Sequence, residues 1–317
     1  MYRKIMGFLE AWKESEHRKP LILQGARQVG KTYSILEFGR THYENVAYFN
    51  FETNPKLNKT FEENISPDYL IPILSHIAGQ TIVKEKTLIV FDEVQLCERA
   101  LTSLKYFCED APDYHIIVAG SLLGVAVNRA KFSFPVGKVD MKTLYPMDME
   151  EFMLALGEKD LVEQIKKCFH TDTPLPSALH DAAMQLYRQY LVVGGMPECV
   201  MQFAETKDYI LVRHTQDTIL ASYLNDMSKY NNLNEIKKTR LAYDNITVQL
   251  SKKNTRFQYK LIKKGGRASE FENAIEWLCL SGIVSQVYKV EQIKKPLENY
   301  RDIDAFKIYV SDLGLLC

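Results

Sequence analysis

The sequence predicts an α/β fold with a central parallel sheet for the first half of the chain, followed by a mainly helical second half. Two observations lead to this prediction. Up to about residue 145, short runs rich in Ile, Val and Leu alternate with segments of helical periodicity, and after it the pattern is mainly helical to about residue 250. Alternating strands and helices are typical of a parallel sheet covered by helices.

Five segments of the first half are expected to form the sheet. Several show little alternation of apolar and polar residues, as strands that are buried on both faces do. The expected strands are Pro20–Gln24, Val46–Phe51, Thr87–Phe91, His115–Gly120 and Lys138–Leu144. Apolar residues of the N-terminal segment fall on one face of a helix, and Tyr33–His42 and Arg99–Cys108 also have helical periodicity.

The second half is expected to be helical to about Leu250, with turn formers at 170–180 and at the Gly194-Gly195 pair. A further helix and two strand-like segments follow. The expected elements are the helices Met147–Leu156, Leu161–Phe169 and Glu270–Ser281 and the strands Ile283–Val290 and Ala305–Val310. We therefore expect three parts: a core over residues 1–160, a helical region over 161–235, and a C-terminal region over 236–317.

The composition is that of a folded protein without an overall charge. It is 46% hydrophobic, and Lys+Arg and Asp+Glu balance at 40 each, so binding to nucleic acid or to a membrane surface would need a local patch. No stretch reaches the apolar length of a membrane span. The six cysteines are scattered without metal-like spacing, which is typical of reduced thiols. We expect a soluble cytoplasmic protein with no membrane partner.

Residues 25–32 read GARQVGKT and fit the P-loop pattern, with a strand before them and a helix after them. Such a loop points backbone N–H groups at phosphate oxygens, and the helix N-terminus adds about half a positive charge. Lys31 is expected to reach the β- and γ-phosphates, and the Thr32 hydroxyl to ligate Mg²⁺. The bare pattern also fits a glycine turn that happens to precede Lys-Thr. The expected nucleotide-binding residues are Gly25, Ala26, Arg27, Gln28, Val29, Gly30, Lys31 and Thr32.

Polar side chains follow two further strands of the expected sheet. TLIVFDEVQ (87–95) places Asp92 at the carboxyl edge of the sheet, where it would hold Mg²⁺ through water. Glu93 would orient a water for attack on the γ-phosphate, which favours hydrolysis over transfer to a small molecule. Ser121, after the strand 115–120, is either a sensor of the γ-phosphate or a helix N-cap. The expected catalytic residues are thus Glu93, Lys31 and Ser121.

Further segments match a known family, in order and over nearly the whole chain. They are KPLILQGARQVGKT, LIVFDEVQ, AGSLLGVAV, SFPVGKVDMKTLYPMDMEEF, YLVVGGMPECV, NDMSKY, AIEWLCLSGIVSQV and FKIYVSDLGLL. On these segments the chain resembles a large bacterial and archaeal family of AAA-type ATPases with a C-terminal domain of unknown function. The resemblance implies an AAA-like P-loop NTPase core, Mg-ATP as ligand, and a winged-helix-like region after it. It also implies that Asp92 and Glu93 are the metal and water carboxylates and Ser121 the sensor.

The resemblance leaves two family features without a clear counterpart. Members usually continue past the DLGLL segment into a nuclease-like domain, whereas this sequence ends at Cys317, so it represents either a shortened copy or a fragment of a longer protein. AAA-type enzymes also take an arginine finger from a neighbouring subunit, which would make the protein a homo-oligomer. Arg129, Lys138 and Arg188 are candidates, and for any single one of them we favour an ordinary surface charge.

Residues 251–267 read SKKNTRFQYKLIKKGGR and form the clearest charge asymmetry of the chain. They precede the helix that contains AIEWLCLSGI, much as a basic wing flanks a recognition helix in winged-helix modules. We keep two interpretations, contact with a DNA backbone and a solvated surface loop. The candidate contacts are Lys252, Lys253, Arg256, Lys260, Lys263, Lys264 and Arg267.

The motifs and the resemblance together predict an AAA-type protein that binds Mg-ATP, hydrolyses it and couples the nucleotide state to a conformational change, with DNA as a candidate partner. The alternative is a nucleotide-gated module that binds DNA or regulates a partner with little or no turnover. The two share every motif and differ only in whether ATP is hydrolysed.

Overall fold

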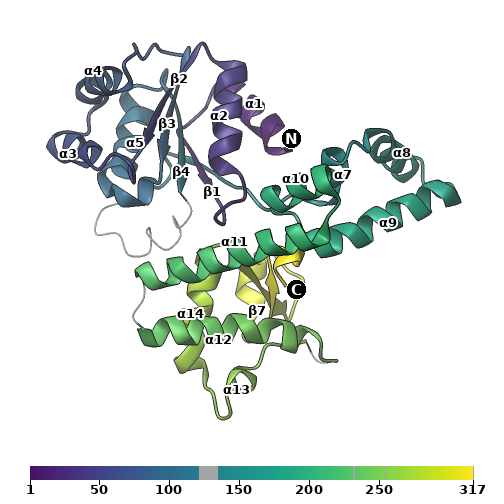
Figure 1. Cartoon of the computed structure of the whole chain (residues 1–317). Helices are drawn as coiled ribbons and strands as arrows, with labels where there is room; N and C mark the ends of the chain where they lie inside the picture. The colour runs from purple at the N-terminus through teal and green to yellow at the C-terminus, as the bar shows by residue number, and fades with distance from the viewer. Residues whose placement is uncertain (121–134, 231–232, 254, 317) are drawn as a thin grey trace. The chain divides into compact units, whose positions relative to one another are not determined.

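A computed structural model describes residues 1–120, 135–230, 233–253 and 255–316 (Figure 1). Its contacts divide the chain into two compact units, Arg3–Tyr145 and a second unit that contains Pro146–Cys317. The boundaries expected at residues 160 and 235 both fall inside the second unit. Within the described ranges, no helix is both long enough and apolar enough to cross a membrane.

The first unit is built on a parallel five-stranded sheet with the order β2-β3-β4-β1-β5. Every residue of β3 and β4 is buried, which explains their continuous apolar runs. The five expected strands are therefore confirmed to within two residues at each end. Their bounds are β1 (Leu21–Gln24), β2 (Asn45–Asn50), β3 (Thr87–Asp92), β4 (His115–Gly120) and β5 (Asp140–Thr143).

Helices cover the two faces of this sheet. Helices α1 and α2 lie on one side of the strands, and α3, α4 and α5 lie on the other (Figure 1). The helices are α1 (Ile5–Glu14), α2 (Lys31–His42), α3 (Lys56–Glu63), α4 (Pro67–Ala78) and α5 (Glu98–Asp110), and a 3₁₀ turn, η1 (Val94–Leu96), follows β3. The Phe91 ring packs against Phe49, Phe51 and Phe61 on the α3 side, so the strand that carries Asp92 is anchored in a core of aromatic rings.

The second unit is mainly helical up to residue 280, and the two strand-like segments expected near its end form strands that pair as an antiparallel hairpin. Helix α12 packs against α14, and both contact the hairpin of β6 and β7. Helix α9 begins at Ser177, so the connection expected at 170–180 is shorter than predicted. The helices are α7 (Met149–Ala155), α8 (Lys159–His170), α9 (Ser177–Val193), α10 (Pro197–Thr206), α11 (Tyr209–Tyr230), α12 (Leu233–Leu250), α13 (Tyr259–Ile262) and α14 (Ala268–Leu280). The remaining elements are β6 (Val284–Val290), η2 (Leu297–Tyr300), β7 (Arg301–Val310) and η3 (Leu313–Leu315).

A buried carboxylate ties the end of this unit to its start. Asp312 accepts a hydrogen bond from the Gly195 N–H at 2.5 Å, and the Gly195 carbonyl accepts one from the Met147 N–H at 2.7 Å. A Cβ atom on Gly195 would lie 2.0 Å from the Met147 carbonyl oxygen, so only glycine fits there. Burial raises the pKa of Asp312 to about 6, although the Gly195 N–H opposes the shift.

Candidate nucleotide-binding site

The loop between β1 and α2 has the backbone conformation that its glycines predict. Gly25 and Gly30 have φ angles of 147° and 88°, and Gln28 between them has 62°. A Cβ atom on Gly25 would lie 2.2 Å from the Leu144 carbonyl oxygen. Gly30 forms the left-handed N-cap of α2, so the loop turns directly into the N-terminus of that helix. The helix start and the loop can therefore present backbone N–H groups to an anion.

Lys31 begins α2 and folds back into the loop. Its ammonium donates hydrogen bonds to the carbonyls of Gly25 at 3.0 Å and Ala26 at 2.7 Å. Burial lowers the pKa of Lys31 to about 8, against the opposing effect of Glu93 and Asp92. A charged phosphate oxygen is a stronger partner for an ammonium than a neutral carbonyl is. The side chain therefore lies where an incoming phosphate could replace its present partners.

The structure brings Thr32 and Asp92 together, although 60 positions separate them in the sequence. The Thr32 hydroxyl donates to Asp92 Oδ2 at 2.9 Å, and the Glu93 N–H donates to Asp92 Oδ1 at 3.0 Å. Among the described residues, no group of three or more His, Cys, Asp or Glu side chains forms a metal cage. A hydroxyl beside one carboxylate fits Mg²⁺, which takes few protein ligands and completes its shell with phosphate oxygens and water.

Glu93 stands one residue beyond β3 in a left-handed conformation, with φ at 52°. This conformation is uncommon for a residue other than glycine and is enriched at functional sites. Its carboxylate is half-buried and accepts a hydrogen bond from the Gln95 side-chain amide. Glu93 therefore lies at the sheet edge beside Asp92, with its carboxylate held by Gln95.

The remaining expected site residues are the sensor Ser121 and the three arginine-finger candidates. Strand β4 lies between β1, which precedes the P-loop, and β3, which ends in Asp92. The chain therefore leaves the sheet at Gly120, between these two strands. Ser121 itself and Arg129 lie outside the described residues. Lys138 forms an ion pair with Glu109 at 2.9 Å, which favours the surface-charge interpretation for this candidate. Arg188 is exposed on α9, in the second unit.

Sequence reasoning missed two side chains that contact the site. The buried Arg3 guanidinium donates to the Val29 carbonyl at 2.8 Å and to the Tyr145 carbonyl at 2.7 Å, so it supports the loop. The Tyr48 hydroxyl donates to Asp92 Oδ2 at 2.7 Å. The sequence carried no signal for either residue, because both contacts depend on which elements are neighbours in space.

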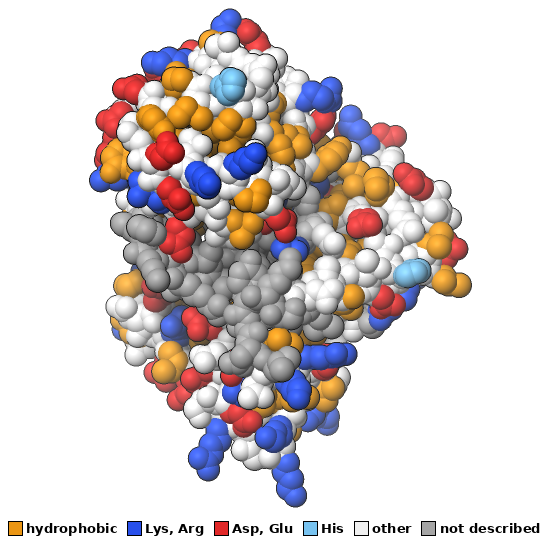
Figure 2. Space-filling view, turned by 60° about the vertical axis from the view of Figure 1, so that its left-hand side comes forward, with side chains coloured by type: hydrophobic (Ala, Val, Ile, Leu, Met, Phe, Trp, Pro, Cys, Tyr) orange, Lys and Arg blue, Asp and Glu red, His pale blue; other side chains and the backbone are white. Residues whose placement is uncertain are grey.

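The basic segment 251–267 divides into exposed charges and two aromatic rings that pack inward, of which Phe257 is buried and Tyr259 half-buried. Phe257 is buried, its ring stacks on Phe306, and its N–H donates to the Phe306 carbonyl at 2.8 Å. Tyr259 packs edge-on against both rings. The aromatic residues thus belong to the core of the unit. The exposed residues are Lys252, Lys253, Arg256, Lys260, Lys263, Lys264 and Arg267, and Figure 2 shows Lys and Arg side chains projecting at the lower end of the molecule.

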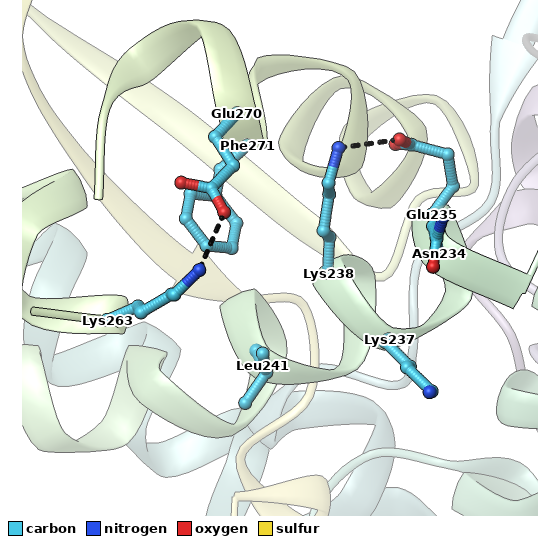
Figure 3. A pocket seen from close by; sticks show the side chains of 8 residues that line it. All are labelled: Asn234, Glu235, Lys237, Lys238, Leu241, Lys263, Glu270 and Phe271. Atoms are coloured by element: carbon cyan, nitrogen blue, oxygen red, sulfur yellow. Dashed lines mark hydrogen bonds and ion pairs between the residues drawn. The ribbon is translucent and has the colours of Figure 1, made fainter. Parts of the chain in front are cut away.

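A pocket of about 410 Å³ lies beside this segment, between α12 and α14 (Figure 3). Lys238 pairs with Glu235 at 2.8 Å, and Lys263 pairs with Glu270 at 3.3 Å. These two ion pairs neutralise most of the charge that lines the pocket. The lining residues are Asn234, Glu235, Lys237, Lys238, Leu241, Lys263, Glu270 and Phe271.

The outer face of α14 is acidic. Glu272 and Glu276 are both exposed on this helix. Carboxylates on that face would repel the phosphates of a nucleic acid. Any contact of this region with DNA is therefore expected from the basic segment before α14, and not from the helix itself.

Comparisons with known proteins agree with the geometry of the first unit. Residues 17–153 match the family model of an AAA domain, and residues 184–317 match that of a domain of unknown function, DUF8612. No curated protein matches the chain.

Solved structures show a remote likeness. One is the Aeropyrum pernix ORC2 protein, with 11% identity over 97% of this chain and 90% of that chain and a TM-score of 0.47. Another is the Thermotoga maritima RuvB Holliday junction branch migration motor, with 13% identity over 97% and 90% of the two chains and a TM-score of 0.37. The family models thus identify an AAA domain at residues 17–153, which precedes a domain of unknown function at residues 184–317.

Proposed function

We propose that the protein binds Mg-ATP, hydrolyses it, and uses the nucleotide state to change the conformation of its second unit. One observation carries the proposal. The P-loop Lys31 and Thr32 meet the acidic pair Asp92 and Glu93 at the carboxyl edge of one parallel sheet, and the Thr32 hydroxyl bonds Asp92 at 2.9 Å. This combination provides a phosphate cradle, a metal-binding pair and a carboxylate for water.

Each residue has a distinct role in this proposal. The loop N–H groups and the Lys31 ammonium would bind the phosphates, and Thr32 and Asp92 would hold Mg²⁺. Bound Mg²⁺ would neutralise charge on the phosphate oxygens. Glu93 would exchange its hydrogen bond with Gln95 for one with water, orient that water and accept its proton. The proposal thus gives hydrolysis to Glu93 and binding to the other three residues.

A continuous stretch of chain supports coupling to the second unit. The Leu144 N–H donates to the Gln24 carbonyl at 2.8 Å, directly before the P-loop, and the Leu144 carbonyl lies against Gly25. Three residues later, Met147 bonds Gly195, which Asp312 holds. A backbone movement of the loop could therefore pass along residues 144–147 to the turn that connects α9 and α10.

A glutamine variant tests the enzyme proposal. Glu93→Gln keeps the size of the side chain and removes its charge, so we expect it to bind Mg-ATP like the wild type and to lose phosphate release. Glu62→Gln changes an exposed carboxylate of α3 and is the matched control. Equal phosphate release from Glu93→Gln and the wild type would refute the role of Glu93. A wild type that binds Mg-ATP without hydrolysing it would favour the alternative, a nucleotide-gated module.

The exposed basic segment supports DNA as a partner, whether the protein hydrolyses ATP or only binds it. The region also has the element order α12, α13, α14 and the β6–β7 hairpin, which supports the winged-helix-like interpretation. We expect duplex DNA to bind more weakly as salt rises from 50 to 200 mM, and expect Lys263→Glu with Lys264→Glu to reduce both affinity and salt slope. Lys159→Glu on α8 is the control, and binding that is indifferent to salt and to both lysines would contradict the idea.

The described cysteines are free thiols, which supports a reducing compartment such as the cytoplasm.

A further inference from the structure

A tyrosine outside the predicted motifs contacts the proposed metal site. Tyr48 lies on β2, the edge strand that pairs with β3, and is aligned with Val90 of that strand. Ala47 and Phe49 on either side of it are buried in the core. Because side chains alternate along a strand, Tyr48 points to the opposite face, together with Asn50. On that face its hydroxyl donates to Asp92 Oδ2 at 2.7 Å.

The three hydrogen bonds to Asp92 fix the orientation of its carboxylate. Oδ2 accepts from Tyr48 and from Thr32, and Oδ1 accepts from the Glu93 N–H. A carboxylate has about four acceptor positions, so these bonds leave roughly one for a further partner. The Tyr48 hydroxyl thereby helps to decide which position remains for a metal-bound water.

Asn50 holds the Tyr48 hydroxyl in place. Its side-chain amide donates to the Tyr48 oxygen at 3.2 Å, and its carbonyl oxygen accepts from the N–H groups of Glu52 and Thr53, both at 2.9 Å. A hydroxyl has one proton, and since Asn50 donates to this oxygen, the Tyr48 proton is directed at Asp92. The turn after β2, Asn50 and Tyr48 thus form one chain of hydrogen bonds that ends on the carboxylate.

We propose that Tyr48 is a positioning residue that orients the Asp92 carboxylate for Mg²⁺, an inference that rests on the proposed Mg-ATP function. Tyr48 acts through Asp92 and has no bond to the P-loop lysine or to Glu93. Its hydroxyl should therefore affect the Mg²⁺ dependence of nucleotide binding and leave the affinity for metal-free ATP unchanged. A tyrosine that served only the stability of β2 would not separate the two quantities.

Tyr48→Phe tests this inference, because it keeps the ring and removes only the hydroxyl. A fluorescent ATP analogue is titrated into each protein in EDTA and at a series of Mg²⁺ concentrations. We expect equal affinity in EDTA and about a tenfold higher Mg²⁺ concentration for half-maximal effect in Tyr48→Phe, as the loss of one charge-assisted hydrogen bond predicts. Tyr69→Phe is the control, since the Tyr69 hydroxyl donates to Glu63 on the surface of the same unit.

The outcomes separate this inference from the function on which it rests. If the wild type shows a Mg²⁺ effect and the Tyr48→Phe curve coincides with it, the positioning role is wrong and the proposed function stands. If Tyr48→Phe also weakens binding in EDTA, the hydroxyl serves the fold or the nucleotide, and the inference is overturned. If the wild type itself binds the analogue without any Mg²⁺ dependence, both the inference and the Mg-ATP proposal fail.

Discussion

His115 is expected to make the first unit unstable in mild acid. The residue starts β4, and its side chain is 4% exposed. Its Nδ1 shares a hydrogen bond of 2.7 Å with the Tyr43 hydroxyl, and the Trp12 ring packs edge-on at 6.2 Å. Burial, with a smaller effect of the Arg18 and Lys13 charges, lowers the pKa of His115 from 6.5 to about 4. The native unit therefore holds this imidazole neutral.

The sign of the pH effect follows from the direction of the shift. The unfolded chain takes up a proton on His115 near pH 6.5, whereas the folded unit does so only near pH 4. The contribution of His115 to stability is therefore fully present above pH 6.5 and is lost as the pH falls toward 4. Each unit of pKa shift corresponds to about 1.4 kcal/mol, so the whole shift is worth about 3 kcal/mol. Allowing for solvent screening, we expect a loss of about 1–2 kcal/mol at pH 5.

Tryptophan fluorescence can follow this unit alone. The chain has two tryptophans, Trp12 in the first unit and Trp277 in the second, so Trp277→Phe leaves a reporter that packs against His115. Urea unfolding is measured at pH 8 and pH 5 in this background, with and without His115→Gln. From pH 8 to pH 5, we expect the free energy of unfolding to fall by about 1–2 kcal/mol more in the protein that keeps His115 than in His115→Gln. His17→Gln, at an exposed histidine, is the control, and equal pH dependence in all three proteins would show that His115 is not the group responsible.

Two further predictions concern Gly25 and Asp312. Gly25→Ala would place a Cβ atom 2.2 Å from the Leu144 oxygen at a φ of 147°, so we expect about 10–100-fold weaker ATP binding by calorimetry. Gly7→Ala, with open space around it, is the control, and unchanged affinity of Gly25→Ala would contradict the loop geometry. Because the folded pKa of Asp312 is raised from 3.8 to about 6, its contribution to stability is greatest below pH 3.8 and is lost as the pH rises through 6. Followed by Trp277 fluorescence, the second unit should gain about 2–3 kcal/mol between pH 8 and pH 4 relative to Asp312→Asn. An equal gain in both proteins would show that Asp312 is not the group responsible.

The sequence predicted the sheet and the two motifs at its edge because both signals are local. Buried parallel strands show as continuous apolar runs, and a P-loop requires its glycines and its Lys-Thr pair at fixed spacing. The short helices α3 and α4 were missed. Prolines stand at or near their starts, and Pro72 lies inside α4, so the segment resembles a loop in composition.

The contacts of Tyr48 and Phe257 could not be predicted for a different reason. Tyr48 reaches Asp92 only because β2 is the neighbour of β3, and the sequence does not state which strands are adjacent. Phe257 stands among the lysines and arginines of segment 251–267, yet its ring stacks on Phe306, 49 positions later, and its N–H donates to the Phe306 carbonyl, so it lies in the core. Such side chains acquire their environment from tertiary pairing, and periodicity within one segment carries no information about it.

Hydrolysis by Glu93 can be tested on the nucleotide that remains on the protein after incubation with Mg-ATP. Wild type and Glu93→Gln are incubated with Mg-ATP, separated rapidly from free nucleotide, and the bound nucleotide is identified by chromatography. We expect ADP on the wild type and intact ATP on Glu93→Gln, because the variant keeps the phosphate and metal contacts and loses the carboxylate that activates water. Intact ATP on both proteins, or ADP on both, would contradict this expectation.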